Sequence, residues 1–281
     1  MERDATLNPA TKIPDEPLER TLHGKLWSPK NSDGQFRGEV TLREAIEKSR
    51  NVPAVHLSEW VGLANTQRDL KRFGFSRATH LPSVALGAFS TTPLEAAKAY
   101  TVFATNGILR EPELIHAVVR GQDQVLWQNN RQSTQVLSKR ATQLTHSILE
   151  GVMLDGTART APQYGITKNA AGKTGTTNEL VDAWFAGFNP DIVTVTWMGF
   201  DQPRTLGKHE SGARAALPIW IDYMRPIINE YPTKILESPY GIVPLRINPK
   251  DGMLAKKGED GIFEYFYDEF LPTKNAYFLL N

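Results

Sequence analysis

Residues 170–178 read AAGKTGTTN, and they lie between a helix-like segment and two apolar runs rich in valine, tryptophan and phenylalanine. A lysine flanked by glycines and followed by hydroxyl side chains has two chemical interpretations. The first is a phosphate-binding loop, which needs a glycine five positions before the Gly-Lys-Thr. That position holds Thr167, and the runs that follow, 182–187 and 192–200, have the composition of strands and not of a helix. Spacing and context therefore exclude a phosphate loop.

The second interpretation is a strand edge that presents Lys173, Thr174 and Thr176 to an anionic substrate. An ammonium beside two hydroxyls can hold a carboxylate, and Gly175 lets another backbone approach closely. The tripeptide Lys-Thr-Gly consists of common residues and also occurs by chance. Other features of the chain are therefore needed to show whether it marks a site.

Composition limits the classes of function that are open. The 281 residues suffice for one large domain or two modest ones, and 40% hydrophobic with 22% charged residues is typical of a globular protein. The net charge of +1 favours neither nucleic acid nor an anionic membrane surface as a partner. The absence of cysteine excludes disulfides and a cysteine nucleophile, and the six histidines lack metal-ligand spacing, so we expect no metal and no cofactor. No run approaches 18 apolar residues, and the N-terminus lacks the apolar core of an export signal.

Residues 41–60 predict two helices joined by a short connection. Residues 1–40 are rich in proline, aspartate, asparagine and glycine and are expected to be an irregular lead-in. Thr41 and Glu44 form a capping box, which predicts a helix to about residue 49. Pro53 interrupts that helix and begins a second one at 53–60. Ser49-Arg50-Asn51 is therefore expected on the connection between the two helices.

The remaining pattern predicts alternating helices and strands. The aromatic cluster at 263–267 is expected to pack on the main body, in a tail that turns irregular from residue 232. The other expected elements are helices at 66–73, 93–105, 138–154 and about 214–231, a hairpin of 113–120 with 124–128, and the strands at 182–187 and 192–200.

Two tripeptides gain meaning when they are considered together. Alone, Ser49-Arg50-Asn51 is an ordinary helix terminus. Combined with the downstream Lys173-Thr174-Gly175, it matches the second and third signatures of penicillin-binding proteins and class A β-lactamases. Seven further segments fall in the order of that family: WSPKN (27–31), TLREA (41–45), LGAFSTTPLE (86–95), GTAR (156–159), DAWFAG (182–187), WMGFD (197–201) and GARAALPIW (212–220).

The chain resembles the transpeptidase domain of a class A, bifunctional penicillin-binding protein of the 1A type, over roughly residues 15–260. The resemblance implies an α+β fold like that of penicillin-binding proteins and serine β-lactamases, with a helical lobe and an antiparallel sheet. It assigns 1–40 to an irregular lead-in that belongs to the transpeptidase domain, 41–231 to the body of that domain (helical lobe about 41–165, sheet and C-terminal helix about 166–231) and 232–281 to a C-terminal extension. In this family a serine attacks the D-Ala-D-Ala bond of a stem peptide, D-alanine leaves, and an amine of a neighbouring strand takes the acyl group. β-Lactams acylate the same serine.

The resemblance also implies the catalytic roles of three residues. Ser49 would relay a proton toward the leaving amine, which is a general acid–base task. Asn51 would hold the substrate amide through its carboxamide. Lys173 would supply positive potential and keep neighbouring groups in their reactive protonation states. Arg50, between Ser49 and Asn51, is expected to point away from the cleft.

The strand that carries Lys173 would bind substrate or β-lactam through Thr174, Gly175, Thr176 and Thr177. Thr174 and Thr176 would hold the terminal carboxylate. The backbone N–H of Thr176 would form half of the oxyanion hole, a contribution of ~3 kcal/mol to lowering the barrier. Three further residues are expected to support the site structurally: Arg159, Asp182 and Trp184.

One departure from the family pattern concerns the nucleophile. The first signature is Ser-x-x-Lys, and it should precede Ser49 by several tens of residues. None of the serines of this chain has lysine three residues later. We therefore expect a domain truncated at its N-terminus, with no nucleophile and no acyl-enzyme of its own. We also expect that its sheet lacks neighbouring strands and that its stability is marginal unless another segment covers the open face.

The resemblance further implies a location and a set of partners. The family works at the periplasmic, extracytoplasmic face of the cytoplasmic membrane, although no residue here shows export and no transmembrane segment is expected. Peptidoglycan stem peptides and β-lactams are the implied ligands, with other cell-wall synthesis proteins as further partners and no nucleic acid.

Three alternatives to a transpeptidase piece can be weighed. A non-catalytic protein that holds stem peptides or a cell-wall partner also fits Lys173-Thr174-Gly175, because carboxylate binding does not need the nucleophile. A β-lactamase or carboxypeptidase also needs the missing serine, and the flanking segments match the bifunctional enzymes better. A chance Lys-Thr-Gly in an unrelated protein conflicts with the number of ordered segments.

Overall fold

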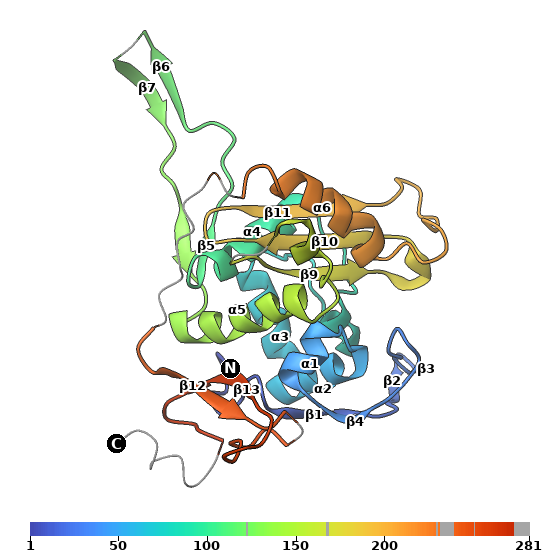
Figure 1. The fold of residues 1–281 in the computed structure, drawn as a ribbon. Helices are drawn as coiled ribbons and strands as arrows, with labels where there is room; N and C mark the ends of the chain where they lie inside the picture. Colours follow the sequence, from blue (N-terminus) through green and yellow to red (C-terminus); the bar gives the residue numbers. More distant parts are fainter. Residues whose placement is uncertain (122, 167–168, 229, 231–238, 250, 273–281) are drawn as a thin grey trace.

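A three-stranded antiparallel sheet lies at the centre of the fold, with its strands in the order β11-β10-β9 (Figure 1). The strands are β9 (Ala171–Thr176), β10 (Ala183–Phe188) and β11 (Val193–Met198). Lys173 pairs with Ala186 in the register of β9 and β10. Within the described residues, β9 and β11 each have one edge without a strand partner. The predicted α+β class, the antiparallel sheet and the strand that carries Lys173 are confirmed.

The computed structural model describes residues 1–272 apart from 122, 167–168, 229, 231–238 and 250. The expected end of the last helix at Tyr231, the start of the irregular tail at 232–238 and its end at 273–281 lie outside the described residues.

Helices cover both faces of the sheet, because alternate strand residues point to opposite sides. Phe185 packs edge to face on Trp220, with 5.0 Å between ring centroids, and Phe188 packs on the other side against His146 at 5.4 Å. Trp220, Phe185 and Phe188 are fully buried. Figure 1 shows the sheet between these two layers. The covering helices are α6 (Leu217–Met224) on the Phe185 side and α4 (Pro93–Ala104) and α5 (Lys139–Leu154) on the Phe188 side.

The rest of the helical lobe follows local sequence signals. Thr41 accepts a hydrogen bond from the backbone N–H of Glu44 at 3.0 Å, which confirms the predicted helix start. The other half of the predicted capping box is not formed, because the Glu44 side chain accepts a hydrogen bond from Arg37 at 2.7 Å instead. Thr92 and Glu95 form a full capping box at the start of α4. The other helices are α1 (Leu42–Glu47), α2 (Asn51–Val61) and α3 (Leu63–Arg72), with short turns η1 (Pro82–Leu86), η2 (Ala161–Tyr164) and η3 (Asn178–Leu180).

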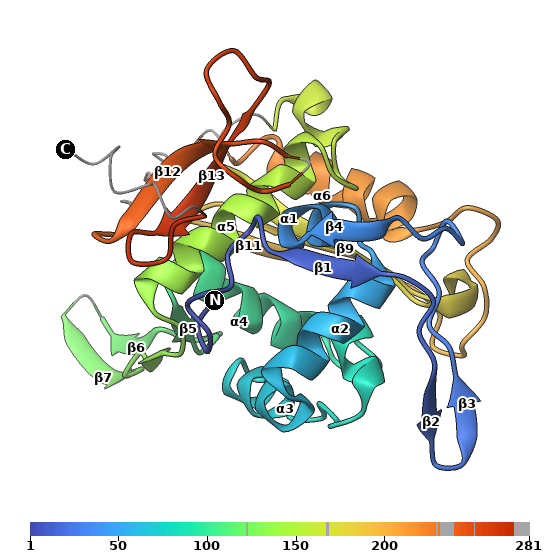
Figure 2. The ribbon, with the colours of Figure 1, turned by 90° about the horizontal axis from the view of Figure 1, so that it is seen from below.

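The lead-in is more regular than its composition predicts. In it, β1 (Lys12–Asp15) pairs with β4 (Gly38–Thr41), and β2 (Arg20–Leu22) pairs with β3 (Lys25–Trp27) in a ribbon that extends from the body in Figure 2. The expectation of an irregular segment was wrong, because burial of Ile13 on the lobe fixes β1 in place.

The second helix begins earlier than Pro53 predicts, so Asn51 is its first residue and lies beyond the connection. The reason is a cap supplied from elsewhere in the chain. The side-chain oxygen of Asn31 accepts hydrogen bonds from the backbone N–H groups of Asn51 and Val52 at 2.9 and 3.3 Å. These N–H groups at a helix start have no partner inside the helix.

A slender arm leaves the helical lobe after α4. The predicted hairpin is confirmed as β6 (Ala117–Arg120) and β7 (Gln124–Gln128), although β6 is shorter than expected. A second pair of strands, β5 (Ile108–Arg110) and β8 (Ser133–Gln135), joins the arm to the lobe. Figure 1 shows the β6–β7 ribbon projecting away from the body.

The last helix differs from its predicted start at Arg214. Residues Gly212–Ala216 form a π-helical turn, and α6 proper starts at Leu217 with Pro218 in its first turn. A Cβ built on Gly212 would lie 2.4 Å from the carbonyl oxygen of Gly175. The turn therefore presses its backbone directly onto β9, and this close approach sets the local geometry.

The C-terminal part is a hairpin and not the irregular tail that its prolines predict. Strands β12 (Ile242–Ile247) and β13 (Ile262–Tyr267) pair antiparallel, and they lie beside α5 in Figure 2. Along β13 Phe266 and Tyr267 are buried, whereas Phe263 is exposed, so the aromatic cluster packs on the body only in part. Glu264 anchors the hairpin through Arg43 of α1, with 2.6 Å between Nη2 and Oε1.

Candidate active site

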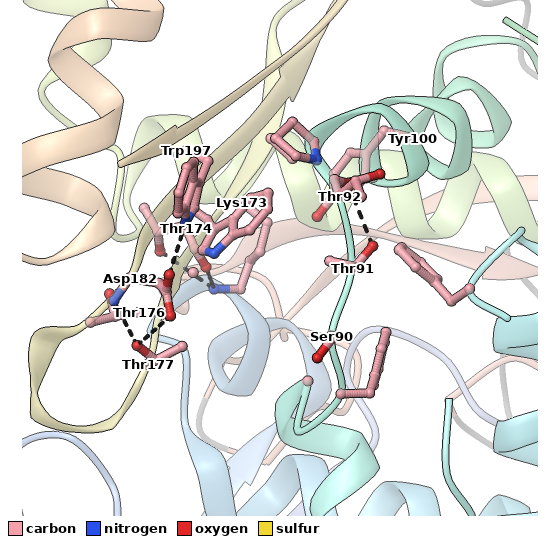
Figure 3. Close-up of a pocket in the computed structure, with 18 of the residues that line it drawn as sticks. Ser90, Thr91, Thr92, Tyr100, Lys173, Thr174, Thr176, Thr177, Asp182 and Trp197 are labelled. Carbon is pink, nitrogen blue, oxygen red and sulfur yellow. Dashed lines mark hydrogen bonds between the residues drawn. The ribbon is translucent and has the colours of Figure 1, made fainter. Parts of the chain in front are cut away.

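A cleft of about 580 Å³ opens between β9 and the loop that precedes α4. One wall carries the predicted strand residues Lys173, Thr174, Gly175, Thr176 and Thr177. The opposite wall is formed by residues 86, 87 and 89–93, and it includes Ser90, Thr91 and Thr92 (Figure 3). Aromatic rings complete the lining: Phe75, Phe89, Tyr100, Trp184 and Trp197. The cleft therefore combines hydroxyl groups and one ammonium with apolar surface.

Lys173 lies where the cleft meets the helical lobe. Its Nζ donates to Ser49 Oγ at 2.8 Å and to the carbonyl oxygen of Thr174 at 3.0 Å. Desolvation by burial lowers the pKa of Lys173 from 10.5 to about 8. The ammonium therefore holds its proton at neutral pH less firmly than an exposed lysine would.

Ser49 and Asn51 lie behind Lys173, and the cleft walls do not include them. Ser49 is partly exposed and reaches Lys173 from the connection between α1 and α2. The side-chain amide of Asn51 donates to the carbonyl oxygen of Lys30 at 2.7 Å. The structure thus brings Ser49 and Lys173 into contact, whereas the Asn51 carboxamide is held by the lead-in. Arg50 does point away from the cleft, as predicted, and its side chain is buried.

The hydroxyls of the strand are already engaged. Thr174 Oγ1 shares a hydrogen bond of 2.7 Å with Thr157 Oγ1, and Thr174 is largely buried. Thr176 Oγ1 accepts from the backbone N–H of Gly212 at 2.9 Å, while the residue stays exposed to the cleft. A carboxylate could bind here by replacing or joining these contacts. Their roles toward substrate stay a prediction.

Asp182 accepts hydrogen bonds from two other residues that line the cleft. The indole N–H of Trp197 donates to Asp182 Oδ1 at 2.9 Å, and the hydroxyl of Thr177 donates to Asp182 Oδ2 at 3.3 Å. Trp184 packs against Trp197 with 6.1 Å between ring centroids. The supporting role expected of Asp182 and Trp184 stays a prediction. Arg159 lies on an exposed turn, and its side chain has no ion pair among the described residues, so nothing links it to the cleft.

Thr157 and Asn31 are among the contributors that the sequence analysis did not identify. Thr157 belongs to the quoted GTAR segment, yet only the folded chain shows that its backbone N–H donates to Glu47 and its hydroxyl meets Thr174. Asn31 belongs to the WSPKN segment, and its contact with the start of α2 joins residues far apart in sequence. The one signal in the sequence for both residues was that their segments fall in the order typical of the family.

The arrangement suits the binding of an anion beside a proton relay. Lys173 provides the positive charge, and its contact with Ser49 gives a path for a proton between an ammonium and a hydroxyl. Burial raises the pKa of Tyr100 to about 12, so its phenol stays neutral in the cleft wall. Among the described residues no group of three histidine, aspartate or glutamate side chains could hold a metal ion. The helices of the described ranges are too short or too polar to cross a bilayer.

Comparison with known proteins places these features in context. The penicillin binding protein transpeptidase domain matches residues 3–219. Penicillin-binding protein 1A of Aquifex aeolicus is 42% identical over 239 residues, which is 85% of this chain and 33% of that protein. Penicillin-binding protein 1A of Neisseria meningitidis is 38% identical and covers 83% of this chain and 30% of its own length. The chain therefore spans about a third of the curated relatives that it matches.

Solved structures show the same fold. Penicillin-binding protein 1A from Haemophilus influenzae superposes with a TM-score of 0.89 at 31% identity, over 95% of this chain and 46% of that one. PonA1 from Mycobacterium tuberculosis, solved in complex with penicillin V, has a TM-score of 0.68 at 20% identity over 82% of this chain and 66% of its own, a likeness of fold alone.

Proposed function

Because the chain belongs to the penicillin-binding protein transpeptidase domain family, we propose that its cleft serves peptidoglycan cross-linking by D-Ala-D-Ala transpeptidation. The donor stem peptide would lie along β9 with its terminal carboxylate near Lys173, Thr174 and Thr176. The contact of 2.8 Å between Lys173 Nζ and Ser49 Oγ carries this proposal, because it joins the second and third family signatures in one place. Location at the extracytoplasmic face and binding of β-lactams are part of the same proposal.

Each residue near Lys173 has a role in this proposal. Ser49 accepts a hydrogen bond from Lys173, so it can pass a proton to the leaving amine while Lys173 restores it. Asn51 would have to release the carbonyl oxygen of Lys30 to hold the substrate amide. The Thr176 N–H would stabilise the oxyanion. The nucleophile itself has no counterpart in this sequence, so these groups supply binding and proton transfer only.

A stereochemical binding test addresses the proposed function. We expect a peptide ending in D-Ala-D-Ala to bind the chain without covalent chemistry, and its L-Ala-L-Ala counterpart to bind at least about tenfold more weakly, because the cleft has to match both carboxylate and methyl positions. Isothermal titration calorimetry measures both affinities. Equal affinity for the two peptides would contradict a stem-peptide site.

Acylation is expected to be absent in this chain. Incubated with excess penicillin, it should show no increase in intact mass, since no serine is followed by lysine three residues later. Mass spectrometry after several hours provides the readout, with the Ser49→Ala variant measured in parallel. An adduct of one penicillin on the parent chain would show that a serine present here is the nucleophile. Loss of that adduct in Ser49→Ala would identify it as Ser49.

A second candidate function is binding alone, in which the cleft holds stem peptides or a cell-wall partner without reaction. The observation that favours it is the intact Lys173-Thr174-Gly175 strand in a sequence without Ser-x-x-Lys. Peptide binding without acylation is expected of both candidates. Acylation of a longer chain that includes a Ser-x-x-Lys segment would decide for the transpeptidase.

A further inference from the structure

Ser49 has a backbone conformation that needs support. Its φ is +55°, in the left-handed region that residues with a Cβ rarely adopt. Such a residue keeps its conformation only when the surrounding structure fixes it. In this conformation the Ser49 hydroxyl accepts the hydrogen bond of Lys173 Nζ. Whatever holds the backbone of Ser49 therefore also holds its contact with Lys173.

The next residue, Arg50, is anchored in the protein interior. Its Nε and Nη2 donate to Asp15 Oδ2 at 2.9 and 2.7 Å, and its Nη1 donates to Asp33 Oδ2 at 2.6 Å. The side chain of Arg50 is 3% exposed and that of Asp15 is fully buried. Asp15 belongs to β1 and Asp33 to the turn before β4, so the lead-in supplies both carboxylates.

Asn31 connects this buried ion pair with the residue on the other side of Arg50. Its side-chain N–H donates to Asp15 Oδ1 at 2.7 Å, and its oxygen accepts from the backbone N–H of Asn51 at 2.9 Å. Both carboxylate oxygens of Asp15 are thus engaged, one by Arg50 and the other by Asn31. The three side chains form one continuous bracket behind the Ser49–Asn51 connection.

We propose that Asp15, Asn31 and Arg50 are positioning residues of this site, which fix Ser49 in the conformation that meets Lys173 and fix Asn51 at the start of α2. A buried ion pair contributes little to stability compared with well-packed apolar side chains, because desolvation of the charges opposes their attraction. Its directional hydrogen bonds do determine where the flanking backbone lies. The consequence for substrate rests on the proposed function, whereas the consequence for the Ser49–Lys173 contact does not.

The first test follows the pKa of Lys173 by NMR of the labelled lysine amine in the intact chain. Ser49→Ala removes one acceptor of the ammonium, so the pKa of Lys173 is expected to fall below its value in the parent chain. Arg50→Lys keeps the charge but cannot make the paired hydrogen bonds, and it should lower the pKa to the same value. The double variant should go no lower. An unchanged pKa in Arg50→Lys, or additive effects in the double variant, would overturn the proposal.

Two further variants separate positioning from loss of stability. Arg20 makes a bidentate pair with Glu59 at 2.9 and 2.7 Å outside the cleft, so Arg20→Lys is a chemically matched control that should leave the pKa of Lys173 unchanged. Asn31→Ala removes the hydrogen bond from Asn31 to Asp15 and should lower the pKa of Lys173 as Arg50→Lys does. It takes the place of Arg50→Lys in the test if the Arg50 variant does not fold. Urea unfolding of each variant gives its stability.

The second test uses the D-Ala-D-Ala peptide and calorimetry. Arg50→Lys should weaken binding about tenfold in the parent chain and by clearly less in an Asn51→Ala background, because part of its effect acts through Asn51. An equal loss in both backgrounds would refute positioning through Asn51. If the parent chain does not bind the peptide at all, the proposed function fails. The pKa of Lys173 in the single and double variants then still shows whether the bracket positions Ser49.

Discussion

Replacing Lys173 with alanine is expected to weaken binding of a D-Ala-D-Ala peptide at least about thirtyfold. The reason is that Lys173 supplies the one ammonium among the described residues that line the cleft, next to the hydroxyls of β9. Calorimetry at neutral pH measures the loss, with Lys71→Ala on the exposed face of α3 as the control that should bind normally. Unchanged affinity in Lys173→Ala would show that the carboxylate binds elsewhere.

The charge of Lys173 also determines the pH dependence of that binding. Its pKa of about 8 means that the ammonium form prevails below pH 8 and is lost as the pH rises through that value. Affinity for the peptide carboxylate is therefore expected to be about tenfold lower at pH 9 than at pH 7. In Lys173→Ala this pH dependence should disappear, which separates the lysine from other titrating groups.

Replacing Gly212 with alanine is expected to lower the free energy of unfolding by roughly 3 kcal/mol. The added Cβ would lie 2.4 Å from the carbonyl oxygens of both Gly175 and Trp184, and neither backbone can move without disturbing the β9–β10 pairing. The π-helical turn would have to leave the sheet, and the hydrogen bond from the Gly212 N–H to Thr176 would break. Urea unfolding measures the change in stability.

A neighbouring substitution provides the control for Gly212→Ala. Ser211 precedes the π-helical turn and makes no side-chain cap there, so Ser211→Ala should change the free energy of unfolding by less than about 0.5 kcal/mol. If Gly212→Ala changed the free energy of unfolding equally little, the packing of the turn on β9 would not require glycine at this position.

Local signals explain the part of the fold that the sequence predicts. The caps at Thr41 and Thr92 define helix starts within four residues of chain, and both are present in the structure. The strands around Lys173 follow from β-branched and aromatic composition. The lead-in strands were missed because β1 gains its partner from residue 38 onward and is fixed by burial, which no short window contains. Pro244 is compatible with β12 because a two-stranded ribbon leaves backbone N–H positions unpaired.

The candidate site was predictable as a set of residues and not as an arrangement. The two tripeptides identified Ser49 and Lys173, and the structure places their side chains 2.8 Å apart. The lowered pKa of Lys173 comes from tertiary burial, which sequence spacing does not encode. The contacts from Thr157 to Thr174 and from Asn31 to Asn51 likewise depend on packing between distant segments.

Arg43 and Glu264 pair in the interior although 221 residues separate them along the chain. Bringing such distant residues together costs chain entropy before the contact gives any stabilisation, and contacts of this range slow the folding of a domain. Arg43 lies in α1, which leads directly into Ser49, so the segment that carries this hydroxyl reaches its final surroundings only once β13 has docked. The C-terminal hairpin thereby couples the rate at which the cleft matures to a loop closure that spans 221 residues.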